Sequence, residues 1–197
     1  TDEAETGWGM WVDNKQPAWG MIGDTAVGSN ARPYLTSSAA SDYTVGHWQH
    51  LVGVYNPAAG SGTTANKTQM FMYLNGVNLT GDGSGNTLQV AYSASTTANT
   101  AGLLENNGAF KIGASDLDVE ATSDAPFYGA ISEVSFWNAL LTSEDIAMIF
   151  NGGKPPNLLV HPKAANLKGW WLGGDGTVTW SVDAHTVQDS SGSGFHM

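Results

Sequence analysis

The chain has 197 residues, of which 41% are hydrophobic and 10% aromatic, with a formal net charge of −11 and no cysteine. Its 7 basic residues against 18 acidic ones offer no basic surface for nucleic acid or an anionic membrane, and no apolar run approaches the roughly 20 residues that span a bilayer. The missing thiols exclude disulfides, thiolate metal sites and cysteine catalysis, while the length and aromatic content indicate a folded chain.

Alternating apolar residues in the first half of the chain predict a series of short strands. The best marked cover residues 45–55, where Trp48 is expected in the core, and residues 68–74. Asn75–Gly76 follows directly and is the usual sequence of a two-residue hairpin turn. Shorter strands are expected at residues 8–12, 19–22, 88–92 and 110–112.

Residues 129–137 predict a further strand, which is followed by one short helix. Both faces of this strand carry apolar side chains, as is typical of an inner strand buried on both sides. Thr142 and Asp145 match a capping box, so the helix is expected near residues 143–150. The glycines at 152–153 can supply a left-handed helix end.

Several segments together resemble laminin G-like domains, which belong to the concanavalin A-like lectin/glucanase superfamily. They are FYGAISEVSFWNALLTSEDI at residues 127–146, HWQHLVGVYN at 47–56, QMFMYLNG at 69–76 and FKIG at 110–113. The resemblance covers residues 8–153 and implies an all-β fold, a jelly-roll β-sandwich of two antiparallel sheets. It is specific for the fold and not for an activity.

The domain prediction is a laminin G/lectin-like sandwich over residues 1–153 with a C-terminal extension, residues 154–197, packed on the same domain. The extension resembles tails that follow laminin G-like domains in virion proteins of bacteriophages, marine phages in particular, through NGGKP, GWWLGGD and DSSG. Short strands are expected in it at residues 158–160, 169–172 and 177–182.

The resemblance also implies a missing strand. Laminin G-like domains carry one ahead of the strand that residues 8–12 resemble, and it pairs beside the closing strand, here residues 129–137. Residues 1–7 are too short and too acidic to replace it. Because an unpaired edge invites association, we expect a tail strand at 170–172 or 177–182 to cover it, or else a strand from a neighbouring subunit, which would make the protein a homo-oligomer.

Aromatic side chains are the candidates for ligand binding, because lectin-like folds stack exposed rings on sugars. The candidates are Trp19, Tyr34 and Tyr92, and the alternative for such residues is burial in the sandwich or an interface. The acidic loop at residues 115–125 is the candidate cation site, because calcium prefers carboxylate and carbonyl oxygens. Its candidate ligands are Asp116, Asp118, Glu120 and Asp124.

The favoured function is a non-catalytic, lectin-like binding or decoration module with calcium as the only candidate cofactor. The resemblances imply a virion or extracellular location, with virion or other assembly proteins and cell-surface glycans as partners, and neither nucleic acid nor membrane. One alternative is a purely structural assembly module. Another is a glucanase-type hydrolase using Asp116, Asp118 and Glu120, although the family pattern has Glu at the first of these positions.

Overall fold

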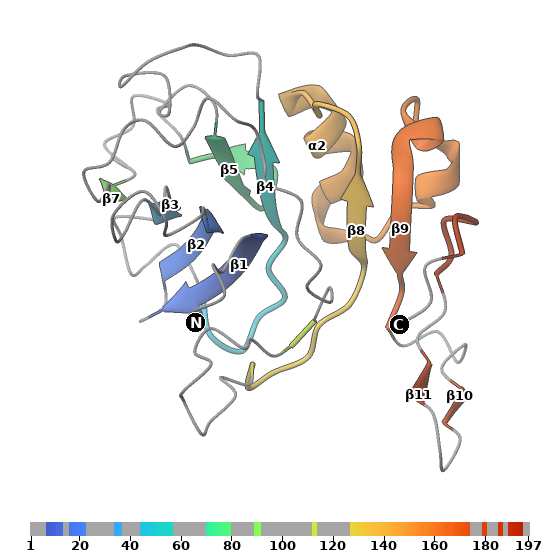
Figure 1. Cartoon of the computed structure of the whole chain (residues 1–197), viewed down its shortest axis with the longest axis horizontal. Helices are drawn as coiled ribbons and strands as arrows, with labels where there is room; N and C mark the ends of the chain where they lie inside the picture. The colour runs from blue at the N-terminus through green and yellow to red at the C-terminus, as the bar shows by residue number, and fades with distance from the viewer. Residues whose placement is uncertain are drawn as a thin grey trace, which may run out of the picture. The chain divides into compact units, whose positions relative to one another are not determined.

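The computed structural model describes the chain at residues 7–13, 16–22, 34–36, 44–56, 70–79, 89–91, 112–113, 127–173, 179–180, 185–186 and 189–194. The chain forms two compact units, and both are discontinuous (Figure 1). The first unit contains residues 1–107 and 140–156, and the second contains residues 108–139 and 157–197. The compact units therefore do not divide at residue 153, and the packing of the tail on the sandwich stays a prediction.

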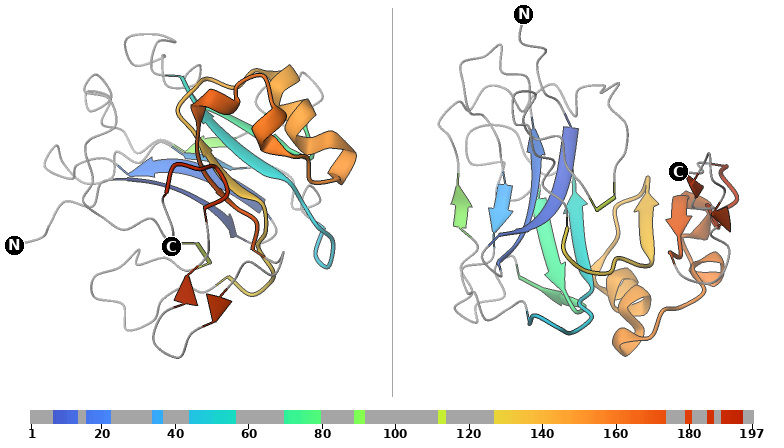
Figure 2. Two further views of the ribbon diagram at one scale, coloured as in Figure 1. Left: turned by 90° about the vertical axis from the view of Figure 1, so that its right-hand side faces the viewer. Right: turned by 90° about the horizontal axis from the view of Figure 1, so that it is seen from below.

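The first unit contains two antiparallel sheets (Figure 2). One has the strand order β1-β2-β3-β7, and the other has the order β4-β5-β6. Their bounds are β1 Gly7–Asp13, β2 Gln16–Ile22, β3 Tyr34–Thr36, β4 Leu51–Tyr55, β5 Met70–Leu74, β6 Val77–Asn78 and β7 Gln89–Ala91. These strands confirm the expected β-sandwich, including the strands predicted at residues 8–12 and 19–22 and the described parts of those predicted at 68–74 and 88–92.

A core between the two sheets holds this sandwich together. It contains Trp19 from β2, Leu79, which follows β6, and three residues of β5, namely Met70, Met72 and Leu74. The period of two along β5 turns its three apolar members to the same face, and Met72 is fully buried. Gly53 in β4 lets the sheets approach, since a Cβ there would lie 2.5 Å from Cδ2 of Trp19.

The predicted hairpin turn is confirmed, but the strand predicted over residues 45–55 is shorter than expected, because β4 begins only at Leu51. Asn75 and Gly76 both adopt positive φ, 52° and 79°, and Leu74 pairs with Val77 across the turn. β5 ends at Leu74, opposite Leu51, and beyond this pair the Asn75 N–H donates to His50 O at 2.8 Å. Residues 45–50 are therefore not part of the strand. The expectation that Trp48 lies in the core is therefore wrong, and its side chain is 72% exposed.

The predicted helix is confirmed as α2, Ser143–Phe150. Thr142 Oγ1 accepts from Asp145 N at 3.3 Å, and Asp145 Oδ2 accepts from Thr142 N at 2.8 Å, which completes the capping box. The first left-handed residue at the other end is Asn151, with φ 45° and ψ 40°, and not one of the two glycines. Both glycines follow with positive φ in the short 3-10 helix η3, Asn151–Gly153.

The second unit contains the closing strand β8, Val134–Trp137, paired antiparallel with β9, Leu167–Trp171. This confirms that a tail strand covers the edge of the closing strand. Glu133 has a φ of 57°, which breaks the extended backbone and explains why β8 starts later than predicted. The register shifts between Phe136 and Trp137, and Phe136 is 42% exposed. The prediction of burial on both faces is therefore wrong.

The tail contains turns of 3-10 helix as well as strands. Residues Leu158–Val160 form the 3-10 helix η4 instead of the predicted strand, because the Asn157 side chain accepts from Leu159 N at 3.0 Å and caps the turn. The 3-10 helix η5, Ala164–Asn166, leads into β9. β10, Thr179–Trp180, pairs with β11, His185–Thr186. Among the described residues, no helix is long and apolar enough to cross a membrane.

Candidate functional site

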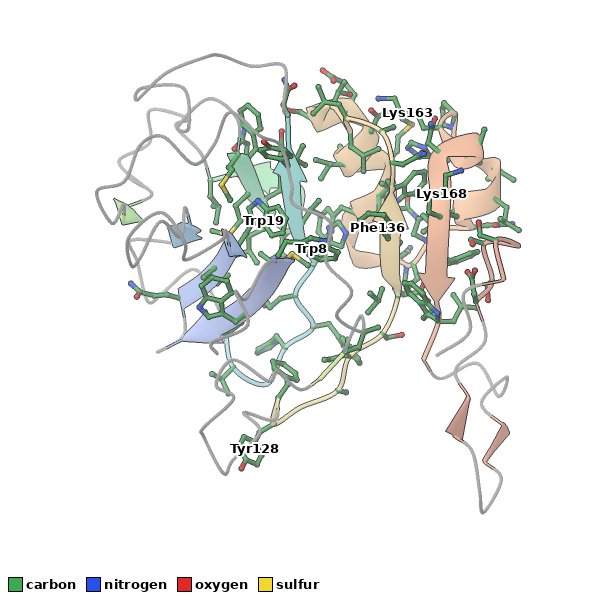
Figure 3. The ribbon with its side chains drawn as sticks, viewed as in Figure 1. Trp8, Trp19, Tyr128, Phe136, Lys163 and Lys168 are labelled. Carbon is green, nitrogen blue, oxygen red and sulfur yellow. The ribbon has the colours of Figure 1, made fainter. Side chains whose placement is uncertain are left out.

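Trp19 is the one aromatic candidate whose side chain the structure describes. Trp19 is only 6% exposed and meets Trp8 edge to face, with ring centroids 5.9 Å apart and planes at 63° (Figure 3). Its ring faces are covered by the core, so they are not open to a sugar. Tyr34 pairs through its backbone with Gly20 and Ala91. The Tyr34 side chain and the whole of Tyr92 lie outside the described residues.

The predicted calcium ligands also fall outside the described part of the chain. Asp116, Asp118, Glu120 and Asp124 all belong to residues 114–126, which the structure does not describe. Within the described ranges, no three His, Asp or Glu side chains come together as a metal site would require. The acidic loop therefore stays a prediction.

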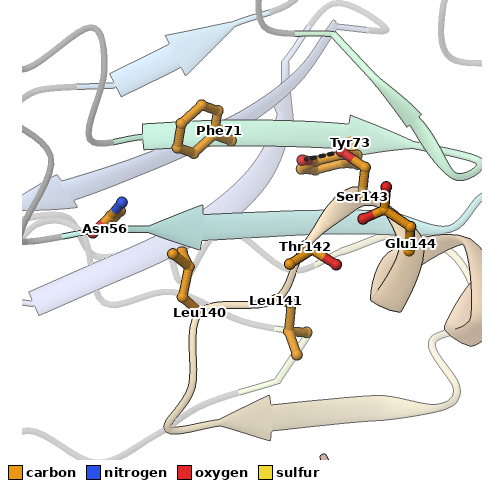
Figure 4. A pocket seen from close by; sticks show the side chains of 8 residues that line it. All are labelled: Asn56, Phe71, Tyr73, Leu140, Leu141, Thr142, Ser143 and Glu144. Atoms are coloured by element: carbon orange, nitrogen blue, oxygen red, sulfur yellow. Dashed lines mark hydrogen bonds between the residues drawn. The ribbon is translucent and has the colours of Figure 1, made fainter. Parts of the chain in front are cut away.

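A surface depression in the first unit is the candidate site, and we call it the outer hollow (Figure 4). Its volume is about 290 Å³. It lies beside β5 and the segment that leads into α2, and Asn56, which follows β4, also lines it. The lining residues are Asn56, Phe71, Tyr73, Leu140, Leu141, Thr142, Ser143 and Glu144.

The alternation along β5 explains why aromatic rings reach this hollow. Met70, Met72 and Leu74 point into the core, so Phe71 and Tyr73 emerge on the opposite face of the same strand. Phe71 is half-buried and Tyr73 is 5% exposed. The core pattern thereby fixes an aromatic wall on the outer face of the sheet.

Polar groups from the start of α2 complete the hollow. The hydroxyl oxygens of Tyr73 and Ser143 lie 3.1 Å apart and share a hydrogen bond, which connects the aromatic wall to the helix. A serine hydroxyl has one donor and two acceptor positions, so the Ser143 hydroxyl can form further hydrogen bonds. The exposed hydroxyl of Thr142 accepts from Asp145 N. The outer hollow therefore combines ring surface with hydroxyl groups held in place.

Glu144 supplies the carboxylate among the lining residues. Hydrogen bonds from its own backbone N–H and from the Thr142 side chain lower the pKa of Glu144 below its ordinary value of 4.5. The group is therefore ionised at neutral pH and tied to the first turn of the helix. Asp145, the neighbouring acid, is 6% exposed and accepts from Thr142 N, so its carboxylate serves the helix cap.

Sequence reasoning missed these lining residues. The alternation at residues 70–74 and the helix start at Thr142 were both visible in the sequence. Their meeting was not, because Tyr73 and Ser143 are 70 residues apart. Two features of the sequence could have indicated the site, namely the aromatic residues that alternate with the core residues of β5 and the capping box at the start of α2.

A laminin G family model, described as the concanavalin A-like lectin/glucanases superfamily, matches residues 1–147. The match includes β1 to β8 and the first turn of α2. It therefore includes every lining residue of the outer hollow. Searches of curated proteins and of solved structures returned no significant match.

Proposed function

The chain belongs to the concanavalin A-like lectin/glucanase superfamily, and from this premise we propose that it is a non-catalytic, lectin-like module that binds saccharides in the outer hollow. The observation that carries the proposal is the lining itself, which includes the Phe71 ring, the Ser143 hydroxyl and the Glu144 carboxylate. Sugars present both an apolar C–H face and hydroxyl groups, and recognition needs partners for both. A volume of about 290 Å³ is at the lower end of ligand pockets, about 300–1,000 Å³, which suits a short saccharide.

The non-catalytic assignment rests on the carboxylates. Glycoside hydrolysis normally needs two carboxyl groups on either side of the scissile bond. In the part of the lining that the structure describes, Glu144 is the one carboxylate, and Asp145 is occupied in the capping box. A hydrolase at residues 116–120 remains the alternative, and release of reducing sugar from β-glucans that Glu120→Gln abolishes would replace the present proposal.

Binding can be tested by separating the ring face of Phe71 from its packing. Phe71→Leu keeps an apolar side chain but removes the flat ring, so affinity for a bound oligosaccharide is expected to fall about tenfold, or about 1.4 kcal/mol. Met148→Ala is the control, because Met148 is exposed on α2 and does not line the hollow. Equal affinity in Phe71→Leu and wild type, measured by calorimetry, would show that the sugar does not bind against the Phe71 ring.

The biological setting is proposed from the tail sequence. Its resemblance to phage virion proteins supports a capsid decoration, fibre or tail protein that attaches to cell-surface glycans outside the cell. Such a protein would work as a homo-oligomer or within a larger assembly. Mass spectrometry of purified particles from the source organism would test this setting, and finding the chain only in cell lysate would contradict it.

A second candidate function is a structural assembly module. Exposed apolar side chains in the second unit favour it, namely Tyr128 at 93%, Phe136 at 42% and Val160 at 79% exposure. Figure 3 shows the side chain of Tyr128. If these residues form an assembly contact, Tyr128→Ser should lower the oligomer fraction in light scattering. An unchanged mass in Tyr128→Ser, Phe136→Ser and Val160→Ser would leave the candidate without support.

Calcium in the acidic loop is the remaining part of the proposal. A cation that binds only the folded chain raises its stability by mass action. We therefore expect excess calcium to raise the melting temperature relative to chelator. The double substitution Asp116→Asn with Asp118→Asn should remove the shift, and an unchanged wild-type midpoint would eliminate the site.

A further inference from the structure

The outer hollow also carries an argument about the charge of its ligand. This argument rests on the proposed function, because it concerns the saccharide that the hollow would take. The proposed function leaves open whether that saccharide is neutral, sulfated or sialylated. Three observations on the described residues decide between these classes.

The first observation is the charge of the lining. Among the described residues that line the hollow, Glu144 is the charged side chain and none is basic. An anionic glycan normally needs arginine or lysine partners, because paired N–H donors compensate the desolvation of sulfate or carboxylate. Here a sulfate or sialate would meet a carboxylate of the same sign.

The second observation is the state of the helix start. The first backbone N–H groups of a helix attract anions when nothing caps them. In α2 the N–H of Asp145 bonds to Thr142 Oγ1, and the N–H of Glu144 bonds to its own carboxylate. The chain's own oxygen atoms thereby occupy two of the first N–H donors of α2.

The third observation is the state of the acid. Glu144 lines the hollow and is exposed, and its hydrogen bonds lower its pKa, so the carboxylate stays ionised. An ionised carboxylate has about four acceptor sites, which leaves sites that can accept from sugar hydroxyls. Neighbouring hydroxyl groups of a neutral sugar are donors of this kind.

We infer that the outer hollow selects neutral, hydroxyl-rich saccharides and rejects sulfated and sialylated ones, with Glu144 as the specificity-determining residue. Like charges in contact repel weakly in water, and we expect this repulsion to lower the affinity for an anionic glycan about fivefold. Salt weakens this repulsion at the exposed rim. The selection should therefore be strongest at low ionic strength.

The test compares matched glycans on wild type and Glu144→Gln. A printed array carries neutral oligosaccharides, each beside a sulfated or sialylated derivative of the same core, and the affinities of the bound pairs are then measured by calorimetry at low and high salt. We expect the wild type to bind neutral cores at least about fivefold more tightly than their anionic derivatives. Glu144→Gln should bind the neutral core more weakly and narrow the difference, and Met148→Ala should change neither.

The outcomes separate the inference from the function on which it rests. Anionic derivatives that bind wild type as well as, or better than, their neutral cores overturn the selectivity while saccharide binding stands. A neutral preference that persists undiminished in Glu144→Gln removes Glu144 as its cause and overturns the inference as well. If no glycan of either kind binds, the proposed function fails and the inference fails with it.

Discussion

Oδ1 of Asp189 accepts a hydrogen bond from the backbone N–H of Trp170 at 2.9 Å, and this bond is buried. The same oxygen accepts from Ser191 N at 2.8 Å, and the Ser190 N–H donates to Trp170 O at 2.7 Å. Asp189 is 4% exposed. One buried side chain thus joins the end of the tail to β9, the strand that pairs with the closing strand.

The first prediction concerns this junction. Asp189→Ala leaves the buried Trp170 N–H without its acceptor, so the free energy of unfolding should fall by about 1–3 kcal/mol. Asp189→Asn keeps an oxygen at the same place and should cost less. Urea unfolding measures both variants, with Val160→Ala as control, because Val160 is 79% exposed and its side chain makes no hydrogen bond. Equal losses for alanine and asparagine would contradict the role of Oδ1.

The second prediction concerns the spacing of the two sheets. Gly53→Ala places a Cβ 2.5 Å from the Trp19 ring, and the overpacked core should cost about 1–3 kcal/mol of stability. Gly9→Ala in β1 is a matched control, because its Cβ would meet nothing closer than 4.0 Å. Thermal melts of the two variants should separate clearly, and coincident melts would mean that Trp19 can move aside freely.

The third prediction is a pH dependence centred on His50. Its ring stacks on Phe150 with centroids 5.8 Å apart, and burial lowers the pKa of His50 below its ordinary value of 6.5. The unfolded chain therefore binds the proton more readily than the folded one. The stability that the neutral ring confers should be complete above pH 6.5 and be lost as the pH falls from there through the folded pKa.

His50→Phe provides the comparison for this pH effect. Phenylalanine keeps an aromatic ring against Phe150 but cannot titrate, and Nδ1 of His50 is buried with no hydrogen-bond partner in the described structure. The free energy of unfolding of wild type should drop more than that of His50→Phe between pH 7.5 and 5. Parallel curves would show that His50 does not titrate in this window.

The fourth prediction concerns the pairing of β8 with β9. A truncation that ends at Gly153 removes β9 and leaves the edge of β8 open, so the product should aggregate or lose stability. Size-exclusion chromatography with light scattering and a thermal melt measure this. A truncated chain that remains soluble, monomeric and as stable as the full chain would contradict a structural role for the tail.

Local signals in the sequence predicted the local structure. The pair Asn75–Gly76 fixed its turn because few residues adopt positive φ easily, and Thr142 with Asp145 fixed the helix start because each side chain reaches the other's backbone. The alternation of Met70, Met72 and Leu74 with Phe71 and Tyr73 also predicted a strand, which is confirmed as β5. Each of these features depends on residues within five positions of one another.

Features that depend on distant partners were missed. Trp48 is exposed because β5 ends at Leu74, before it could pair with Trp48. The residues around Trp48 do not indicate where β5 ends. Trp19 became a core residue because Met72 and Leu74 from another sheet face it. The outer hollow escaped prediction for the same reason, since Tyr73 and Ser143 meet only in the folded chain.

The pairing of β8 with β9 also sets an order in which the protein can be made. Glu133 and Trp170, which bond at the start of this pair, are 37 residues apart. At about 5–20 residues per second, β8 leaves the ribosome about 2–7 s before its partner strand is complete. The residues synthesised in that interval include 140–156, which belong to the first unit. Helix α2 can therefore pack into the first unit before β9 has been synthesised. A chain stalled on the ribosome in this interval would expose the unpaired edge of β8, and other nascent chains could pair with it.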